Sequence, residues 1–400
     1  MNKKWYKWLV VLSLMITIAA TNLFFITQLP SKQASANLQE TACRNCHQEI
    51  YDSYAKTAHA IDSRTASTES IKGSFDNSNN SFHYNLFMHV DMLKENKKLV
   101  QSSKISGEEI QRASFDIVIG SGRKGQSYLY WNKNNLFQLP ISYYARTQSW
   151  CNSPGFPNLA YFDRPISLNC LECHATAAKT TNPNGQGNEY DRKSIVLGIG
   201  CQKCHGEGSA HISHHIKNPT DSVGKFIVNT ANMERQIRLD GCALCHSGMR
   251  KAIKPPFSFT VGKKLDAFSV ANPVSNQADT LDVHGNQYGL LAASKCFTAS
   301  AQMDCSSCHN VHKEEYNDPK LFSQKCMDCH GGKHQKSCTV KAEGLGTLQN
   351  NCIDCHMPVL PSKKIQLDLG KREKMEPDYI RTHYIAIYRE ESRKLLKQLP

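Results

Sequence analysis

Seven segments with the pattern Cys-x-x-Cys-His recur along this 400-residue chain and use fourteen of its seventeen cysteines. The two thiols of such a segment lie about one helical turn apart, so both can bond to the vinyl groups of one haem while the adjacent histidine binds the iron. The sequence therefore predicts seven covalently attached haem c groups. The attaching cysteines are Cys43, Cys46, Cys170, Cys173, Cys201, Cys204, Cys242, Cys245, Cys305, Cys308, Cys326, Cys329, Cys352 and Cys355.

Each motif histidine is a predicted proximal iron ligand, and ten further histidines remain to supply distal ligands. His83 and His89, in a β-rich segment, are expected to be structural. Two imidazoles on one iron leave no open position, which is typical of a low-potential electron relay. The predicted proximal ligands are His47, His174, His205, His246, His309, His330 and His356, and the predicted distal ligands are His59, His211, His215, His284, His312, His334 and His383.

Zinc is the alternative occupant of Cys-x-x-Cys knuckles, but zinc sites use knuckles in pairs and need no histidine after each one. The odd number of motifs and the histidine in every motif favour haem. Three cysteines lie outside the motifs. A disulfide between Cys296 and Cys338 is expected in an oxidising compartment, which leaves Cys151 free or paired differently.

The N-terminus predicts export. Three lysines precede an apolar run from Leu9 to Ile26, and Ala34-Ser35-Ala36 offers a cleavage site. A run of about 18 apolar residues is also close to the length that spans a bilayer. Residues 1–36 are therefore a signal peptide or an N-terminal membrane anchor, and either one places the remainder in the periplasm or on the outer face of the cytoplasmic membrane.

The formal net charge of +13 would suit a protein that binds nucleic acid, but the chain has no Lys/Arg block of the required length. The propionates of the predicted haems would balance much of this charge. No nucleic-acid partner is expected.

The motifs are unevenly spaced, with one near the N-terminus and six from Cys170 onward. Between the first two, runs such as FDIVIGSG and QSYLYW are rich in the β-branched and aromatic residues of strands. We expect a first haem-binding segment at 37–72, a β-rich insertion at 73–150 that serves for packing, and a six-haem domain at 151–400. Because porphyrins would supply much of the core, the expected fold is mainly α with sparse regular structure, a multihaem cytochrome c array.

Several segments carry more than haem spacing, among them CRNCHQEIYDSYAKTAHA, GIGCQKCHGEGSAH and SKCFTASAQMDCSSCHNVH. From about Gln39 onward the chain resembles exported multihaem cytochromes of the cytochrome c-552/4 type, within the broad multihaem cytochrome superfamily. The resemblance implies distal ligation by His59, His211 and His312. It also implies haems stacked in close pairs that form a continuous path for electrons.

These observations favour an electron carrier over an enzyme without deciding between them. A carrier would pass electrons from a membrane quinol dehydrogenase to a terminal reductase in a respiratory chain. The alternative is a multihaem oxidoreductase that acts on a small inorganic nitrogen or sulfur compound at one open-coordinate haem; no Cys-x-x-Cys-Lys motif marks such a haem. The carrier predicts two ligands on every iron, and the enzyme predicts one open iron.

Overall fold

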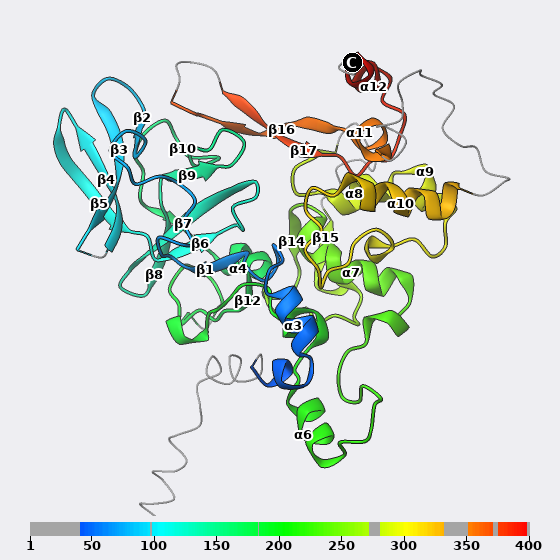
Figure 1. The fold of residues 1–400 in the computed structure, drawn as a ribbon. Coiled ribbons are helices and arrows are strands. Elements are labelled where there is room, and N and C mark those ends of the chain that lie inside the picture. The colour runs from blue at the N-terminus through cyan, green and yellow to red at the C-terminus, as the bar shows by residue number, and fades with distance from the viewer. Residues whose placement is uncertain are drawn as a thin grey trace, which may run out of the picture.

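The computed structural model describes residues 41–96, 98–182, 184–271, 281–331, 351–370 and 375–397. Strands dominate up to about residue 199, and short helices dominate after it (Figure 1). The predicted signal or anchor at 1–36, the predicted ligand His334 and the predicted disulfide partner Cys338 lie outside these ranges. Within them, no helix is long and apolar enough to cross a membrane.

The largest sheet has seven strands, all paired antiparallel. Its main path runs in the order β1-β6-β7-β8-β11, and β9 pairs with both β7 and β10. The sheet joins segments on both sides of the expected insertion, because β1 precedes it and β11 follows it. The strands are β1 (Ser63–Thr65), β6 (Ile117–Ile119), β7 (Gly125–Asn132), β8 (Asn135–Gln138), β9 (Ile141–Tyr144), β10 (Ser149–Asn152) and β11 (Arg164–Pro165).

A second antiparallel sheet has four strands in the order β2-β3-β4-β5. Ser106 and Gly107 link its last two strands, and both have positive φ, as a tight two-residue hairpin turn requires. His83 and His89 are cross-strand partners in this sheet. The strands are β2 (Ser81–His83), β3 (Met88–Glu95), β4 (Lys98–Ile105) and β5 (Glu108–Ser114).

The alternation of side chains along β7 builds two apolar cores, one on each face of the large sheet. Tyr128 and Tyr130 enter the core shared with the four-stranded sheet. Leu129 enters the opposite core, which includes Leu168 and Leu171 of the helix α4. One motif helix is thus anchored directly on the sheet.

The α-helices are short, between five and twelve residues for those after residue 167. Three two-stranded sheets accompany them: β12 (Ala175–Ala177) with β13 (Val196–Leu197), β14 (Arg250–Ala252) with β15 (Ser269–Ala271), and β16 (Val359–Leu367) with β17 (Glu376–Arg381). The α-helices are α3 (Gln48–Tyr54), α4 (Leu168–His174), α5 (Cys201–His205), α6 (Ser209–Lys217), α7 (Arg235–His246), α8 (Gln287–Ala292), α9 (Lys295–Ala299), α10 (Pro319–His330), α11 (Cys352–His356) and α12 (Arg389–Leu396). The 3-10 helices are η1 (Arg192–Ser194), η2 (Thr230–Asn232), η3 (Leu265–Ala267) and η4 (Cys305–Ser307).

The expectation of a mainly α fold is wrong. Antiparallel sheets make up much of the described chain, and the strands extend beyond the expected insertion into the C-terminal hairpin β16–β17. The motif helices add little helical content because attachment of a porphyrin needs only one helical turn, and irregular Gly-, Asn- and Pro-containing segments separate them.

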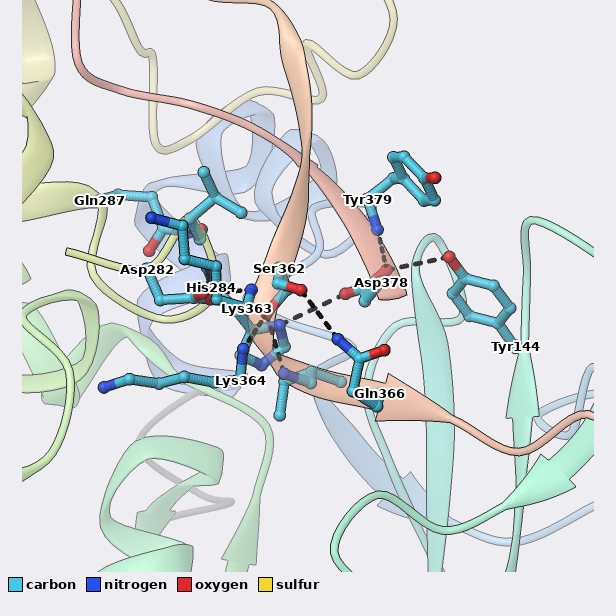
Figure 2. A network of polar contacts seen from close by, with 12 residues as sticks. Tyr144, Asp282, His284, Gln287, Ser362, Lys363, Lys364, Gln366, Asp378 and Tyr379 are labelled. Atoms are coloured by element: carbon cyan, nitrogen blue, oxygen red, sulfur yellow. Dashed lines mark hydrogen bonds and ion pairs between the residues drawn. The ribbon is translucent and has the colours of Figure 1, made fainter. Parts of the chain in front are cut away.

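The hairpin β16–β17 connects the sheets to the helical part (Figure 1). Buried Asp378 of β17 accepts hydrogen bonds from Tyr144 Oη of β9, at 3.1 Å, and from Nδ1 of His284, at 3.3 Å. Buried Asp282 accepts from Ser362 Oγ of β16, at 2.7 Å. Figure 2 shows this network of residues from three distant parts of the sequence.

Candidate haem sites

Five of the seven motifs form the last turn of a helix, and in each case the motif histidine is the last helical residue. The two cysteines are therefore three residues apart on one face of the turn, and the histidine stands at the C-terminal end of the helix. All fourteen motif cysteines are half-buried or exposed, whereas Cys151 is buried in β10. The helices are α4, α5, α7, α10 and α11.

Several motifs lie side by side. The thiol of Cys173 in the second motif lies next to that of Cys245 in the fourth. Likewise, Cys242 of the fourth motif lies next to Cys305 of the fifth, and Cys326 of the sixth next to Cys352 of the seventh. The second, fourth and fifth motifs therefore form one continuous series, and the sixth and seventh form another.

Four motif histidines face a second histidine across a gap. The ring centroids are 6.4 Å apart for His47 and His211, and 6.0 Å apart for His59 and His246. They are 6.1 Å apart for His205 and His312. The fourth pair, His309 with His383, is separated by 6.2 Å. Each pair joins one predicted proximal ligand to one predicted distal ligand.

This spacing fits an iron between the rings. With metal–nitrogen bonds of about 2.0–2.1 Å and the ring radius added at each end, two imidazoles on opposite sides of one metal have centroids roughly 6 Å apart. His83 and His89, neither of which belongs to a motif, stack with their ring centroids 5.0 Å apart. The described residues hold no group of three or more His, Cys, Asp or Glu side chains suited to a metal ion.

Several of the facing rings are surrounded by protein. Burial lowers the pKa of His246 and of His59 below its ordinary value, yet both residues have accessible surface in the exposed range. Burial likewise lowers the pKa of His383 to about 4, so these imidazoles are neutral at pH 7, the form that binds a metal.

A cavity of about 150 Å³ lies between α3 and α5 and is lined by Tyr54 and Cys201, among others. The Tyr54 ring is 6.1 Å from that of His312, which faces His205 of the same motif as Cys201. An attaching cysteine of the third motif thus lines this hollow, and Tyr54 on its other side lies beside the histidine opposite His205.

Hydrogen bonds at Nδ1 orient several of the predicted ligands and leave Nε2 available for a metal. His205 and His356 donate to the backbone carbonyl oxygens of Val228 and Ala386, both at 2.9 Å. His211 of α6 donates to the carbonyl oxygen of Lys225 at 2.9 Å.

His174 differs, because its Nδ1 lies 2.7 Å from a carboxylate oxygen of Asp62. Burial lowers the pKa of His174, but the hydrogen bond to Asp62 and the charge of Asp62 more than offset this, so that the pKa lies above its ordinary value. Sequence reasoning missed Asp62. Its only signal is its position three residues after His59, and its partner is 112 residues away.

Within the described residues, no histidine ring faces His174, His330 or His356 at the spacing of the four pairs. Predicted distal ligands His215 and His284 likewise face no motif ring. His215 packs against His211 at 4.5 Å, and its buried Nε2 has no hydrogen-bond partner.

The cysteines outside the motifs have different surroundings. Burial raises the pKa of Cys151 to about 12, so its thiol is unreactive. Cys296 is half-buried in α9.

Comparisons with known proteins gave a family match and a similar solved structure. The sequence model of the family described as cytochrome c554 and c-prime matches residues 42–109 and 160–206, which contain the first three motifs. Among solved structures, outer cell wall cytochrome OcwA is similar with a TM-score of 0.49 and 16% sequence identity, covering 84% of this chain and 82% of that chain. No curated protein matches the sequence. The family match and the recurring attachment motifs identify the chain as a multihaem c-type cytochrome, an electron-transfer protein with covalently bound haem c.

Proposed function

We propose that this cytochrome is a seven-haem electron carrier that works outside the cytoplasm in a respiratory chain. The observation that carries the proposal is the set of four facing histidine pairs, each made of one motif histidine and one other histidine. When bound, haem would supply an iron that takes up and releases one electron, and the two histidines of a pair would hold it in a form suited to relay rather than to chemistry at the metal.

The chain's own residues hold the proposed path together. His211 follows the third motif and faces the first, whereas His59 follows the first motif and faces the fourth. His312 follows the fifth motif and faces the third. Each of these histidines therefore ties two distant motif segments to one site, which fixes neighbouring sites relative to one another.

The contacts between motifs support short steps between sites. The second, fourth and fifth motifs meet through Cys173 with Cys245 and through Cys242 with Cys305. We propose a membrane quinol dehydrogenase as the electron donor and a terminal reductase as the acceptor. The export signal or anchor predicted at 1–36 would place the protein at the outer face of the membrane.

The alternative is an oxidoreductase with one open iron that acts on a small inorganic nitrogen or sulfur compound. His174, His330 and His356 are the motif histidines that bear on it, because within the described residues no histidine ring faces any of them. The carrier remains the better supported function, since all four complete pairs leave no open position.

Low-temperature EPR of the oxidised holoprotein, with and without cyanide or nitrite, separates the two functions. The carrier predicts only low-spin signals that added ligand leaves unchanged. A high-spin signal that changes on addition of ligand would contradict the carrier and direct the search for a substrate to that iron.

A further inference from the structure

Within the described residues, His174 is the motif histidine whose ring is held by a carboxylate. Its Nδ1 is 2.7 Å from Oδ2 of Asp62, and the Asp62 side chain is only 24% exposed. Where the corresponding hydrogen bonds of other motif histidines are seen, at His205 and His356, the acceptor is a neutral backbone carbonyl.

The loop that carries Asp62 is fixed against the second motif. The carbonyl oxygen of Asp62 accepts a hydrogen bond from the amide of Gly120 at 2.5 Å. Next to it, Ser63 Oγ donates to the carbonyl oxygen of His174 and accepts from the amide of Gly198 at 2.8 Å. The carboxylate is therefore positioned by backbone contacts on both sides and does not depend on a flexible side chain alone.

A carboxylate acceptor raises the basicity of a histidine ligand more than a backbone carbonyl does. Its negative charge pulls the Nδ1 proton toward the oxygen, which raises the basicity of the ring and strengthens its donation to a bound metal. Stronger donation stabilises the oxidised iron relative to the reduced iron and so lowers the reduction potential. Partial burial preserves the effect, because solvent screens the charge less.

We propose that Asp62 is a positioning residue that lowers the reduction potential of the haem attached by Cys170 and Cys173, acting through His174. The inference rests on the proposed function to the extent that a haem is attached at this motif. Among the sites of His174, His205 and His356, the hydrogen bond to the ligand would therefore lower the reduction potential most at His174.

The test is an optical and EPR-monitored redox titration of the holoprotein and its Asp62→Asn variant, after the haem content of each has been measured by mass. Asn keeps the size of the side chain and a carbonyl acceptor but removes the charge. We expect the midpoint potential of the haem at the second motif to rise most. The site of His59 and His246, whose rings also feel the charge of Asp62, should show a smaller rise, and the haem count should stay unchanged. Asp62→Glu should restore the lower potential at least in part.

Two matched variants control for damage to the loop and for charge removal in general. Ser63→Ala breaks the neighbouring contact to His174 without removing charge, and Asp221→Asn breaks a carboxylate contact to His214, 2.9 Å long, at a histidine that is not a predicted ligand. Neither should raise a midpoint potential. The proposal is overturned if Asp62→Asn leaves every midpoint unchanged, loses the haem, or shifts the potentials no more than Ser63→Ala does. Absence of haem from the second motif in the unmodified protein would instead contradict the proposed function.

Discussion

The sheet-rich part of the molecule, residues 63–199, and the motif-rich part, residues 200–397, bury very different amounts of side chain. Of the 37 buried hydrophobic residues among those described, 29 lie before residue 200 and eight after it. The first part has two apolar cores built from its own side chains. The second part contains five of the seven motifs and, among its described residues, few buried apolar side chains.

This difference indicates where the stability of each part comes from. Burial of apolar side chains is the main favourable term in folding, and the sheet-rich part has it. Helices of five to twelve residues are too short to be stable alone, so the motif-rich part must gain its core from elsewhere. Covalently attached porphyrins are large apolar groups at the right positions.

The largest expected effect is therefore that of haem removal. In the full chain produced without haem attachment, the amides of residues 200–397 should exchange with solvent rapidly, whereas those of β3, β4 and β7 should stay protected. Hydrogen exchange followed by mass spectrometry measures both parts at once. Equal protection of the motif-rich part with and without haem would break the comparison.

Loss of one distal ligand should have the next largest effect, confined to one site. His312→Ala removes the ring that faces His205 at 6.1 Å, which would open one iron. We expect one high-spin haem that binds cyanide, detected by EPR, and no such signal from His83→Ala, since His83 pairs only with His89 in the sheet. An unchanged spectrum of His312→Ala would refute this pairing.

A core substitution in the sheet-rich part should act on stability and leave the haems alone. Leu139 is fully buried in the core between the two sheets, so Leu139→Ala should cost about 2–5 kcal/mol of unfolding free energy. Leu86, which is 96% exposed, gives the control, because Leu86→Ala should change stability by at most about 0.5 kcal/mol. Denaturant unfolding followed by tryptophan fluorescence measures both, and a change in the haem spectra of Leu139→Ala would show that the two parts are not separable in this way.

The smallest effect concerns acid stability of the four-stranded sheet. Burial raises the pKa of Asp91, but hydrogen bonds from Ser81 and Lys104 lower it by more than burial raises it. The pKa of Asp91 in the folded protein therefore lies below its value in the unfolded chain. Asp91 therefore contributes stability above the unfolded pKa, about 3.9, and that stability is lost as the pH falls through the lower folded value. In the Asp91→Asn variant, the stability of the sheet should depend less on pH below about 4. Circular dichroism measured as a function of pH tests this. A pH dependence as steep as that of the unmodified protein would contradict this assignment.

The sequence was most informative where the chemistry is local. Attachment of a haem needs residues within one turn, so the motifs could be recognised directly. Strand-rich runs such as QSYLYW also lie where the structure has strands, but their pairing with β1 and β11 could not be seen, because these partners come from outside the insertion.

The ligand geometry depends on long-range contacts that spacing does not encode. His59, His211, His312 and His383 were singled out as distal ligands, yet their partners lie in other motifs. Asp62 illustrates the limit best: one carboxylate among many becomes distinctive only when folding brings it to His174.

The most direct test of the central claim, that haem completes the motif-rich part, is the mass of the intact purified holoprotein under denaturing conditions. The account predicts the polypeptide mass plus seven haem groups that remain attached after unfolding. The polypeptide mass alone would contradict it.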